Sequence, residues 1–437
     1  MKTRVRTRAA AGVTLAAALL ASACGTGGGD TQAAEPKVSD FTGRGPITFV
    51  SGKDVTGNSA QLIDAWNKEH PGQKVTFIEL PSSTDAQRQQ YIQNFETQSG
   101  AYGVIAADVV WTSEFAAQQW IEPLPADQFN TDKMLDPVVE AAEYRGQLYG
   151  VPNYTDAGLL YYRTDLLEKA GIKEPPETWE EMWSQCRKIM KLPEAKDMSC
   201  YAGQYEKYEG LTVNFAEAVQ SAGGSIVGED GKPALDTPEA KKGFNTLVNG
   251  FKSGMIPKEA ITYEEEIGRQ AFQKGELIFH RQWPYQYPLA NARDGSSEVA
   301  GKFDVTTLPG IGGAEGSSSL GGWNLAVSSF TKNKATALDF IKFVTTEEME
   351  RRNLYANGFA PAYASLYEDK QLIKDFPYLP ELKQSILSAQ PRPRVVRYGD
   401  TTLAIQEEVY DALTGEQSAE EALSSLQSRL SGLVSGP

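Results

Sequence analysis

The sequence predicts an α/β fold in which mostly parallel sheets are covered by helices on both faces. Short apolar strands alternate with helices from the start of the folded body, where an apolar strand at 47–50 precedes a Gly-rich loop and a helix, and a second strand follows at 74–80. The composition is that of a folded protein, with 41% hydrophobic, 10% aromatic and 23% charged residues. A chain of 437 residues is long enough for two or three domains.

The same alternation continues along the chain. Asn58 or Ser59 is expected to cap the first helix, and Thr178 a later one, because Glu181 follows Thr178 at the capping-box position. Leucines at helical spacing predict a terminal helix over 423–433. The first helix is expected to end at residue 70. Further helices are expected at 85–97, 211–222, 238–253, 265–274 and 334–345, and further strands at 104–111, 277–279, 303–308 and 321–327. Residues 159–165 are expected to form a strand that enters a helix.

The first residues have the pattern of a secretory signal. Four cations, the last at Arg8, precede an apolar run over 9–20 that is too short for a permanent membrane span. The small residues before Cys24 resemble a bacterial lipobox, which implies removal of residues 1–23 and a diacylglycerol on the Cys24 thiol. An ordinary cut that releases a soluble protein is the alternative. Residues 24–44 then comprise the lipidated cysteine and a flexible tether.

Charge and cysteine content restrict the partners and the compartment. The chain has 42 Lys and Arg against 57 Asp and Glu, a net charge of −15, and removal of residues 1–23 takes away four of the cations. Nucleic acid and anionic membrane surfaces are therefore poor partners. Cys186 and Cys200 form an even pair in an exported chain, which indicates a disulfide. Two buried thiols are the alternative.

The residues offer little material for enzyme chemistry. His70 and His280 are the two histidines of the sequence, so neither a Ser-His-Asp triad nor a multi-histidine metal site is expected. The GxGxxG and GxxxxGK[ST] phosphate loops are absent from the sequence, and no cofactor is expected. Carboxylates such as the run over 264–266 could serve a glycosidase, so a secreted carbohydrate-active enzyme is the rival class.

Aromatic and carboxylate side chains near expected strand ends and loops are typical of a carbohydrate site. A sugar ring stacks its C–H face on an aromatic face, and its hydroxyls need acceptors and donors in fixed directions. The candidates are Trp111, Tyr205, Tyr208, Trp283, Tyr285 and Trp323 with Asp108, Asp156, Glu209 and Glu265. Each aromatic residue taken alone is more often core than ligand contact, and Trp66 and Trp179 are interpreted as packing residues.

The order of motifs over about residues 47–430 resembles that of the extracellular solute-binding proteins of sugar ABC importers. The motifs are the lipobox, Ala107-Asp108-Val109-Val110-Trp111, Gly150-Val151-Pro152, Leu160-Tyr161-Tyr162-Arg163-Thr164-Asp165-Leu166, Thr178-Trp179-Glu180-Glu181, Ser221-Ala222-Gly223-Gly224, Gly322-Trp323-Asn324-Leu325-Ala326-Val327, 337–343 and 358–362. Within this family, the Asp-Val-Val-Trp segment and Trp283-Pro284 look most like trehalose and maltose binding lipoproteins of high-GC Gram-positive bacteria.

The resemblance implies a two-lobed periplasmic-binding-protein-like fold (type II) with a ligand cleft at the hinge. Lobe 1 would comprise 45–153 and 306–345, and lobe 2 would comprise 158–302 and 348–437. Hinge crossings would fall near 153–158, 303–308 and 344–348.

The resemblance also implies a non-enzymatic, monomeric receptor on the outer face of the cell membrane, held there by its lipid anchor alone. Its ligand would be a neutral disaccharide or short oligosaccharide, with an α-glucoside of the trehalose or maltose type favoured. The receptor would deliver this sugar to ABC permease subunits that a cytoplasmic ATPase drives. A different sugar, a polyol or a glycerol derivative is the alternative ligand.

Four charged or aromatic residues match family positions. Asp108 matches the acid before Val-Val-Trp and is expected to accept bonds from sugar hydroxyls. Glu265 matches an acid eighteen residues before Trp283, whose face should stack on a sugar ring. Arg392 matches an arginine that reaches into the cleft from the second lobe.

The remaining candidates carry weaker signals. Asp156 falls where close relatives tend to carry Asn, which removes a hydrogen-bond donor. Gly321 and Gly322 would let the backbone approach the ligand, and Trp323 would narrow one subsite. The last three candidates are Asp54 and Asn58, on the loop after the first strand, and Glu209.

Overall fold

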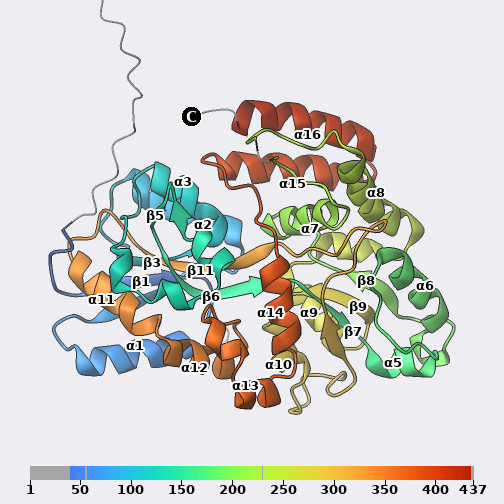
Figure 1. Cartoon of the computed structure of the whole chain (residues 1–437), viewed down its shortest axis with the longest axis horizontal. Coiled ribbons are helices and arrows are strands. Elements are labelled where there is room, and N and C mark those ends of the chain that lie inside the picture. Colours follow the sequence, from blue (N-terminus) through green and yellow to red (C-terminus); the bar gives the residue numbers. More distant parts are fainter. Residues whose placement is uncertain (1–39, 55–56, 229, 435–437) are drawn as a thin grey trace, which may run out of the picture. The chain divides into compact units, whose positions relative to one another are not determined.

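The computed structural model describes residues 40–54, 57–228 and 230–434 (Figure 1). The signal segment, the lipidated Cys24 and the tether up to residue 39, all predicted from the sequence, lie outside the described residues. Within those ranges, none of the helices has the length and apolarity needed to cross a membrane.

The first sheet has the strand order β2-β1-β3-β11-β6. Strand β1 (Ile47–Ser51) pairs in parallel with β2 (Val75–Glu79) and with β3 (Val104–Asp108). Strand β11 (Leu320–Val327) runs antiparallel to both β3 and β6 (Val151–Ala157). Strand β3 is buried along its whole length, which explains its continuous apolar run up to the terminal aspartate.

The second sheet has the strand order β10-β7-β9-β8. Strand β9 (Leu277–Gln282) pairs in parallel with β8 (Ser199–Ala202) and antiparallel with β7 (Leu159–Tyr162). Strand β10 (Asp304–Thr306) is antiparallel to β7. A separate hairpin pairs β4 (Glu143–Tyr144) with β5 (Gln147–Leu148).

The prediction of mostly parallel sheets is confirmed for strand direction, with one exception in each sheet. In the first sheet β11 runs against the other four strands, and in the second sheet β7 runs against the other three. Alternating apolar segments indicate strands but not their direction. The connection from β6 to β7 through Gly158 contains no helix and joins the first sheet to the second. Strand β11 likewise enters the first sheet directly from the loop that follows β10.

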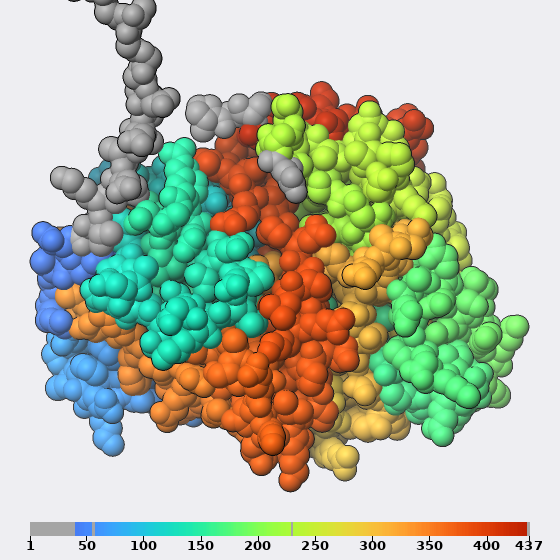
Figure 2. All heavy atoms as spheres, in the orientation of Figure 1, coloured from blue at the N-terminus to red at the C-terminus, as the bar shows by residue number. Residues whose placement is uncertain are grey.

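Helices flank both sheets, as the sequence predicts (Figure 1). Helices α11 and α12 pack near α1, whereas α7, α8, α15 and α16 pack against one another. Helix α14 contacts a strand of each sheet, β6 and β10, and its orange-red atoms lie on the face shown in Figure 2. The bounds are α1 (Asn58–Glu69), α2 (Thr84–Glu96), α3 (Thr112–Ala117), α4 (Asp136–Glu140), α5 (Thr164–Lys169), α6 (Trp179–Ile189), α7 (Glu209–Gln220), α8 (Pro238–Ser253), α9 (Glu265–Gln273), α10 (Gln286–Ala290), α11 (Lys334–Val344), α12 (Glu347–Asn357), α13 (Lys370–Asp375), α14 (Leu379–Ser388), α15 (Tyr398–Thr414) and α16 (Ala419–Val434).

One predicted helix cap is confirmed and one is wrong. The Thr178 hydroxyl accepts the backbone N–H of Glu181 at 3.2 Å, as the capping motif predicts. At α1, Gly57 occupies the cap position with φ of 73°, and no side chain of Asn58 or Ser59 caps the helix. The Asp54 carboxylate instead accepts the N–H groups of Gly57 at 2.9 Å and Ser59 at 2.8 Å.

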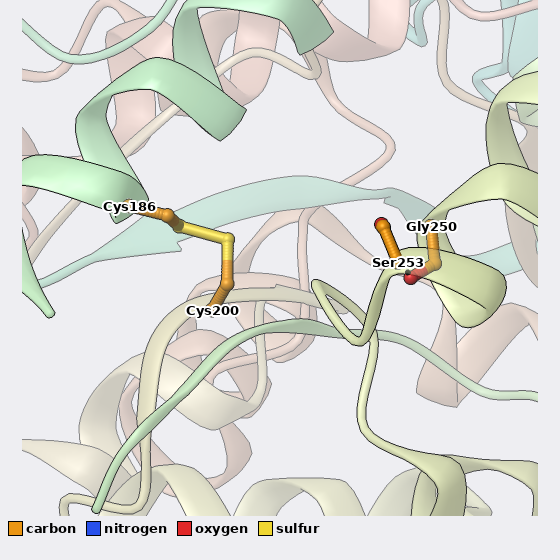
Figure 3. Close-up of a disulfide and its surroundings, with 4 residues drawn as sticks. All are labelled: Cys186, Cys200, Gly250 and Ser253. Atoms are coloured by element: carbon orange, nitrogen blue, oxygen red, sulfur yellow. Dashed lines mark hydrogen bonds between the residues drawn. A yellow bond between two sulfur atoms is a disulfide. The ribbon is translucent and has the colours of Figure 1, made fainter. Parts of the chain in front are cut away.

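The predicted disulfide is confirmed. Cys186 on α6 and Cys200 on β8 are bonded, with an S–S distance of 1.96 Å and Cα atoms 5.5 Å apart (Figure 3). Both residues are fully buried. The bond therefore fixes α6 to the edge of the second sheet.

Candidate functional site

A pocket of about 360 Å³ lies among the loop after β1, the ends of β3, β6 and β11, and the starts of α7 and α9. Every predicted binding residue lines it: Asp54, Asn58, Asp108, Asp156, Glu209, Glu265, Trp283, Gly321, Gly322, Trp323 and Arg392. The sequence thus identifies residues that the fold brings together, and their contacts with a ligand stay a prediction. No group of three or more His, Cys, Asp and Glu side chains is placed to hold a metal in the described ranges.

Arg392 joins the two halves of the pocket. Its guanidinium donates from Nη2 to Asp108 Oδ1 at 3.1 Å and from Nη1 to Glu209 Oε1 at 2.5 Å, and the residue is 2% exposed. Asp108 ends β3 of the first sheet, whereas Glu209 begins α7, which lies beside the second sheet. The backbone N–H of Val110 also donates to Asp108 Oδ1. Asp108 Oδ2 receives no hydrogen bond from the described residues, so it is the oxygen left for a ligand hydroxyl.

The Glu209 carboxylate is surrounded by donors from the protein. The Tyr398 hydroxyl and Arg392 donate to Oε1, and the Thr402 hydroxyl donates to Oε2 at 2.7 Å. Burial raises the pKa of Glu209 to about 7, and the Arg392 charge opposes this shift. Because both oxygens have protein donors, the geometry favours a role in holding Arg392 in place.

Trp283 lies at the pocket wall with one face covered. The Arg281 guanidinium carbon is 3.8 Å from the centroid of the Trp283 ring, a cation–π contact. Arg281 is fully buried and donates to Glu217 from Nε at 2.7 Å and from Nη2 at 2.5 Å. The other face of the Trp283 ring is therefore the one available to a sugar.

The two glycines of β11 make room for neighbouring protein groups, and the approach of a ligand to their backbone stays a prediction. A Cβ on Gly321 would lie 3.0 Å from the Trp283 ring and 3.1 Å from the Asp156 Cβ. Gly322 has φ of 121°, and a Cβ there would lie 2.7 Å from the Tyr154 carbonyl oxygen. Glycine at 321 thus allows Trp283 and Asp156 to approach the strand.

Two tyrosines of the candidate set orient carboxylates. The Tyr208 hydroxyl donates to Glu265 Oε2 at 2.6 Å, and the Tyr285 hydroxyl donates to Glu266 Oε1 at 2.8 Å. Burial raises the pKa of Glu265, and the bond from Tyr208 opposes this shift. A backbone N–H and the Trp283 side chain also donate to the Glu265 carboxylate, which lines the pocket. Of the remaining aromatic candidates, Tyr205 is fully buried core.

Trp111 is core and supports Trp323. Trp111 is 2% exposed, and its ring meets the Trp323 ring edge-on at 5.6 Å. Trp323 pairs with Asp108 across β11 and β3 and is half-buried at the pocket. This position is consistent with the prediction that Trp323 narrows one part of the site.

Asp156 lines the pocket from β6. It faces Gly321 across β6 and β11, and no described residue donates a hydrogen bond to its carboxylate. Burial raises its pKa well above the ordinary value, although the Arg281 charge opposes this. Asp156 is half-buried, and a carboxylate shielded from water without a donor is costly, so a ligand hydroxyl would satisfy it.

Sequence reasoning missed the stacked pair of Tyr154 and Phe359. Their ring centroids are 4.1 Å apart at 13°, and both rings line the pocket. The signals were present, because Tyr154 follows Gly150-Val151-Pro152 and Phe359 lies in the turn at 358–362. Sequence reasoning also missed Arg281, whose role depends on contacts with distant residues.

Comparison with known proteins identifies the family. The sequence profile of the bacterial extracellular solute-binding proteins matches residues 52–351. A probable ABC transporter-binding protein of Deinococcus radiodurans is 33% identical over 376 residues, which cover 84% of this chain and 88% of the relative.

Solved structures have the same fold. Maltose-bound MalE3 of T. maritima is 33% identical, with a TM-score of 0.83 over 88% of this chain and 98% of that chain. The GacH receptor of Streptomyces glaucescens has a TM-score of 0.79 at 21% identity over 90% of this chain and 98% of that chain. The protein therefore belongs to the bacterial extracellular solute-binding protein family and has the two-lobed α/β fold of the maltose-binding proteins.

Proposed function

We propose that this protein is the receptor of an ABC importer and captures a neutral disaccharide or short oligosaccharide, with an α-glucoside of the maltose or trehalose type favoured. The observation that carries the proposal is the pocket itself. It combines the free face of Trp283 with the unpaired carboxylate oxygens of Asp108 and Asp156. The 33% identity to a maltose-bound protein over 88% of the chain supports the same ligand class.

The charge of the pocket favours a neutral ligand over a phosphate ester. Lys53 and Arg392 are its cations, and Arg392 is already paired with two carboxylates. The acids that line the pocket are Asp54, Asp108, Asp156, Glu209, Glu264, Glu265 and Glu266. An anionic ligand would meet this excess of negative charge. The volume of about 360 Å³ falls within the range of small-molecule sites, about 300 to 1,000 Å³.

The pocket also supports capture by closure. A sugar that touches Asp108 on the first sheet and Trp283 after β9 of the second sheet would connect both lobes. Such a ligand binds the closed form better and shifts the population toward it. The lobes keep their proposed bounds of 45–153 with 306–345 and 158–302 with 348–437. Within this proposal, α12 belongs with the second lobe by sequence, although it packs against α1 and α11.

The remaining features of the proposal concern export and partners. The protein would be secreted, would be anchored through a lipid on Cys24 to the outer face of the cell membrane, and would act as a monomer. It would return its sugar unchanged to permease subunits that a cytoplasmic ATPase drives. It would not be an enzyme.

A thermal-shift screen tests the ligand class. The panel contains trehalose, maltose, cellobiose, sucrose, longer glucans and mannitol, the last because a mannitol-binding protein of Pseudomonas aeruginosa is 22% identical to this chain. A ligand at 100 times its Kd should stabilise the protein by about 2.7 kcal/mol. Chromatography of the same sugar after incubation should recover it intact, whereas cleavage products would indicate an enzyme.

A further inference from the structure

Gly158 is a point where two connections between the sheets meet helix α14. The chain passes from the first sheet to the second at this residue, between β6 and β7. Its N–H donates to the hydroxyl of Ser318, which lies on the connection from β10 back to β11, at 2.6 Å. Its carbonyl accepts from the hydroxyl of Ser385 on α14 at 3.0 Å. One peptide segment is thus held by a serine of the other connection and by a serine of α14.

The absence of a side chain at Gly158 is explained by Arg281. A Cβ at this position would lie 2.7 Å from Arg281 Nη2 and 2.8 Å from Nε. Gly158 does not have a positive φ, so backbone conformation does not require glycine here. The residue is glycine because a buried guanidinium occupies the space beside it.

Arg281 connects this point to the pocket. Its guanidinium donates to Glu217, and the Glu217 Oε1 atom also accepts from the Ser318 hydroxyl at 3.3 Å and the Ser319 N–H at 3.1 Å. The same guanidinium lies 3.8 Å from the centroid of the Trp283 ring. A continuous set of buried contacts therefore runs from the pocket wall to the connections between the sheets.

We propose that Arg281 is a positioning residue that couples Trp283 to the connections between the two sheets. This inference rests on the proposed function, because it assigns a role to the ring that a sugar would contact. In an arrangement of this kind, the angle between the sheets and the orientation of the Trp283 ring change together. Closure on a sugar then orients the ring, and a sugar on the ring favours closure.

The substitution Gly158→Ala tests the coupling with little other change. The added methyl group would displace the Arg281 guanidinium, and alanine is compatible with the backbone at this position. Gly72→Ala is the matched control, because Gly72 also lacks a positive φ and has no atom within 4 Å of its added Cβ. If Gly158→Ala does not fold, Arg281→Lys takes its place, since lysine keeps the charge but has no planar group to lie on the ring.

The first readout needs no ligand. The emission of Trp283 is obtained by subtracting the fluorescence spectrum of the Trp283→Phe variant from that of the parent, in each background. We expect this difference spectrum to shift in Gly158→Ala and to stay unchanged in Gly72→Ala. An unchanged Trp283 emission in the folded Gly158→Ala protein would overturn the proposal.

The second readout uses maltose or whichever panel sugar the wild type binds. Gly158→Ala should weaken the affinity at least tenfold and reduce the decrease in radius of gyration that the sugar causes in solution scattering. Wild-type affinity together with a wild-type change in radius would contradict the coupling. If the wild type binds no sugar, the proposed function fails, while the ligand-free fluorescence still decides whether Arg281 positions the ring.

Discussion

The substitution Trp283→Ala separates a ligand platform from a core residue. Arg281 covers one face of the ring, so a sugar loses contact with the other face alone. We therefore expect the lower part of the range for binding hot spots, about 2 kcal/mol, which corresponds to about a thirtyfold weaker affinity. The ligand-free protein should lose about 1 to 2 kcal/mol of stability as well, because a buried guanidinium loses its aromatic neighbour.

Isothermal titration with the panel sugar and thermal unfolding without sugar measure the two effects. Trp183→Ala is the matched control, since Trp183 packs against Trp179 with ring centroids 5.1 Å apart and does not line the pocket. This control should lower the melting temperature and leave the affinity unchanged. Wild-type sugar affinity in Trp283→Ala, together with a melting temperature lowered by many degrees, would refute the assignment of Trp283 to the binding site.

Three further predictions concern pH, the disulfide and the anchor. Burial raises the pKa of Glu209 from 4.5 to about 7, so the folded state binds a proton more readily and the Glu209 contribution to stability is lost as pH rises across this window. Denaturant unfolding at several pH values should show that the free energy of unfolding depends less on pH in Glu209→Gln than in the wild type. The same pH dependence in both proteins would contradict this. Replacing Cys186 and Cys200 by alanine should lower the free energy of unfolding by about 3 kcal/mol in the chain-entropy model without changing sugar affinity. Unchanged stability would contradict a stabilising role of the disulfide. Cys24→Ala should move the protein from the membrane fraction to the medium, and continued membrane retention would count against lipidation.

The sequence predicts the elements well because their signals are local. The Thr178 cap, the apolar run of β3 and the leucine spacing of α16 each depend on residues within a few positions. The direction of β11 was not predictable in this way. It depends on where the chain returns to the first sheet after β10, which is a property of the tertiary fold.

The pocket residues were predictable from the order of family motifs, but their partners were not. Arg281 and Glu217 are 64 positions apart, and Arg392 and Glu209 are 183 positions apart. No local spacing indicates these pairs. As a result, sequence reasoning treated Glu209 as a possible sugar acceptor, whereas the structure gives its carboxylate a full set of protein donors.

We propose that one neutral sugar binds in the pocket defined by Asp108, Trp283 and Arg392. Isothermal titration of the purified mature protein with the sugar of largest thermal shift tests this binding most directly. We expect one sugar per chain, recovered intact, and an affinity reduced about thirtyfold by Trp283→Ala. Absence of binding across the whole panel, or the same affinity in wild type and Trp283→Ala, would contradict it.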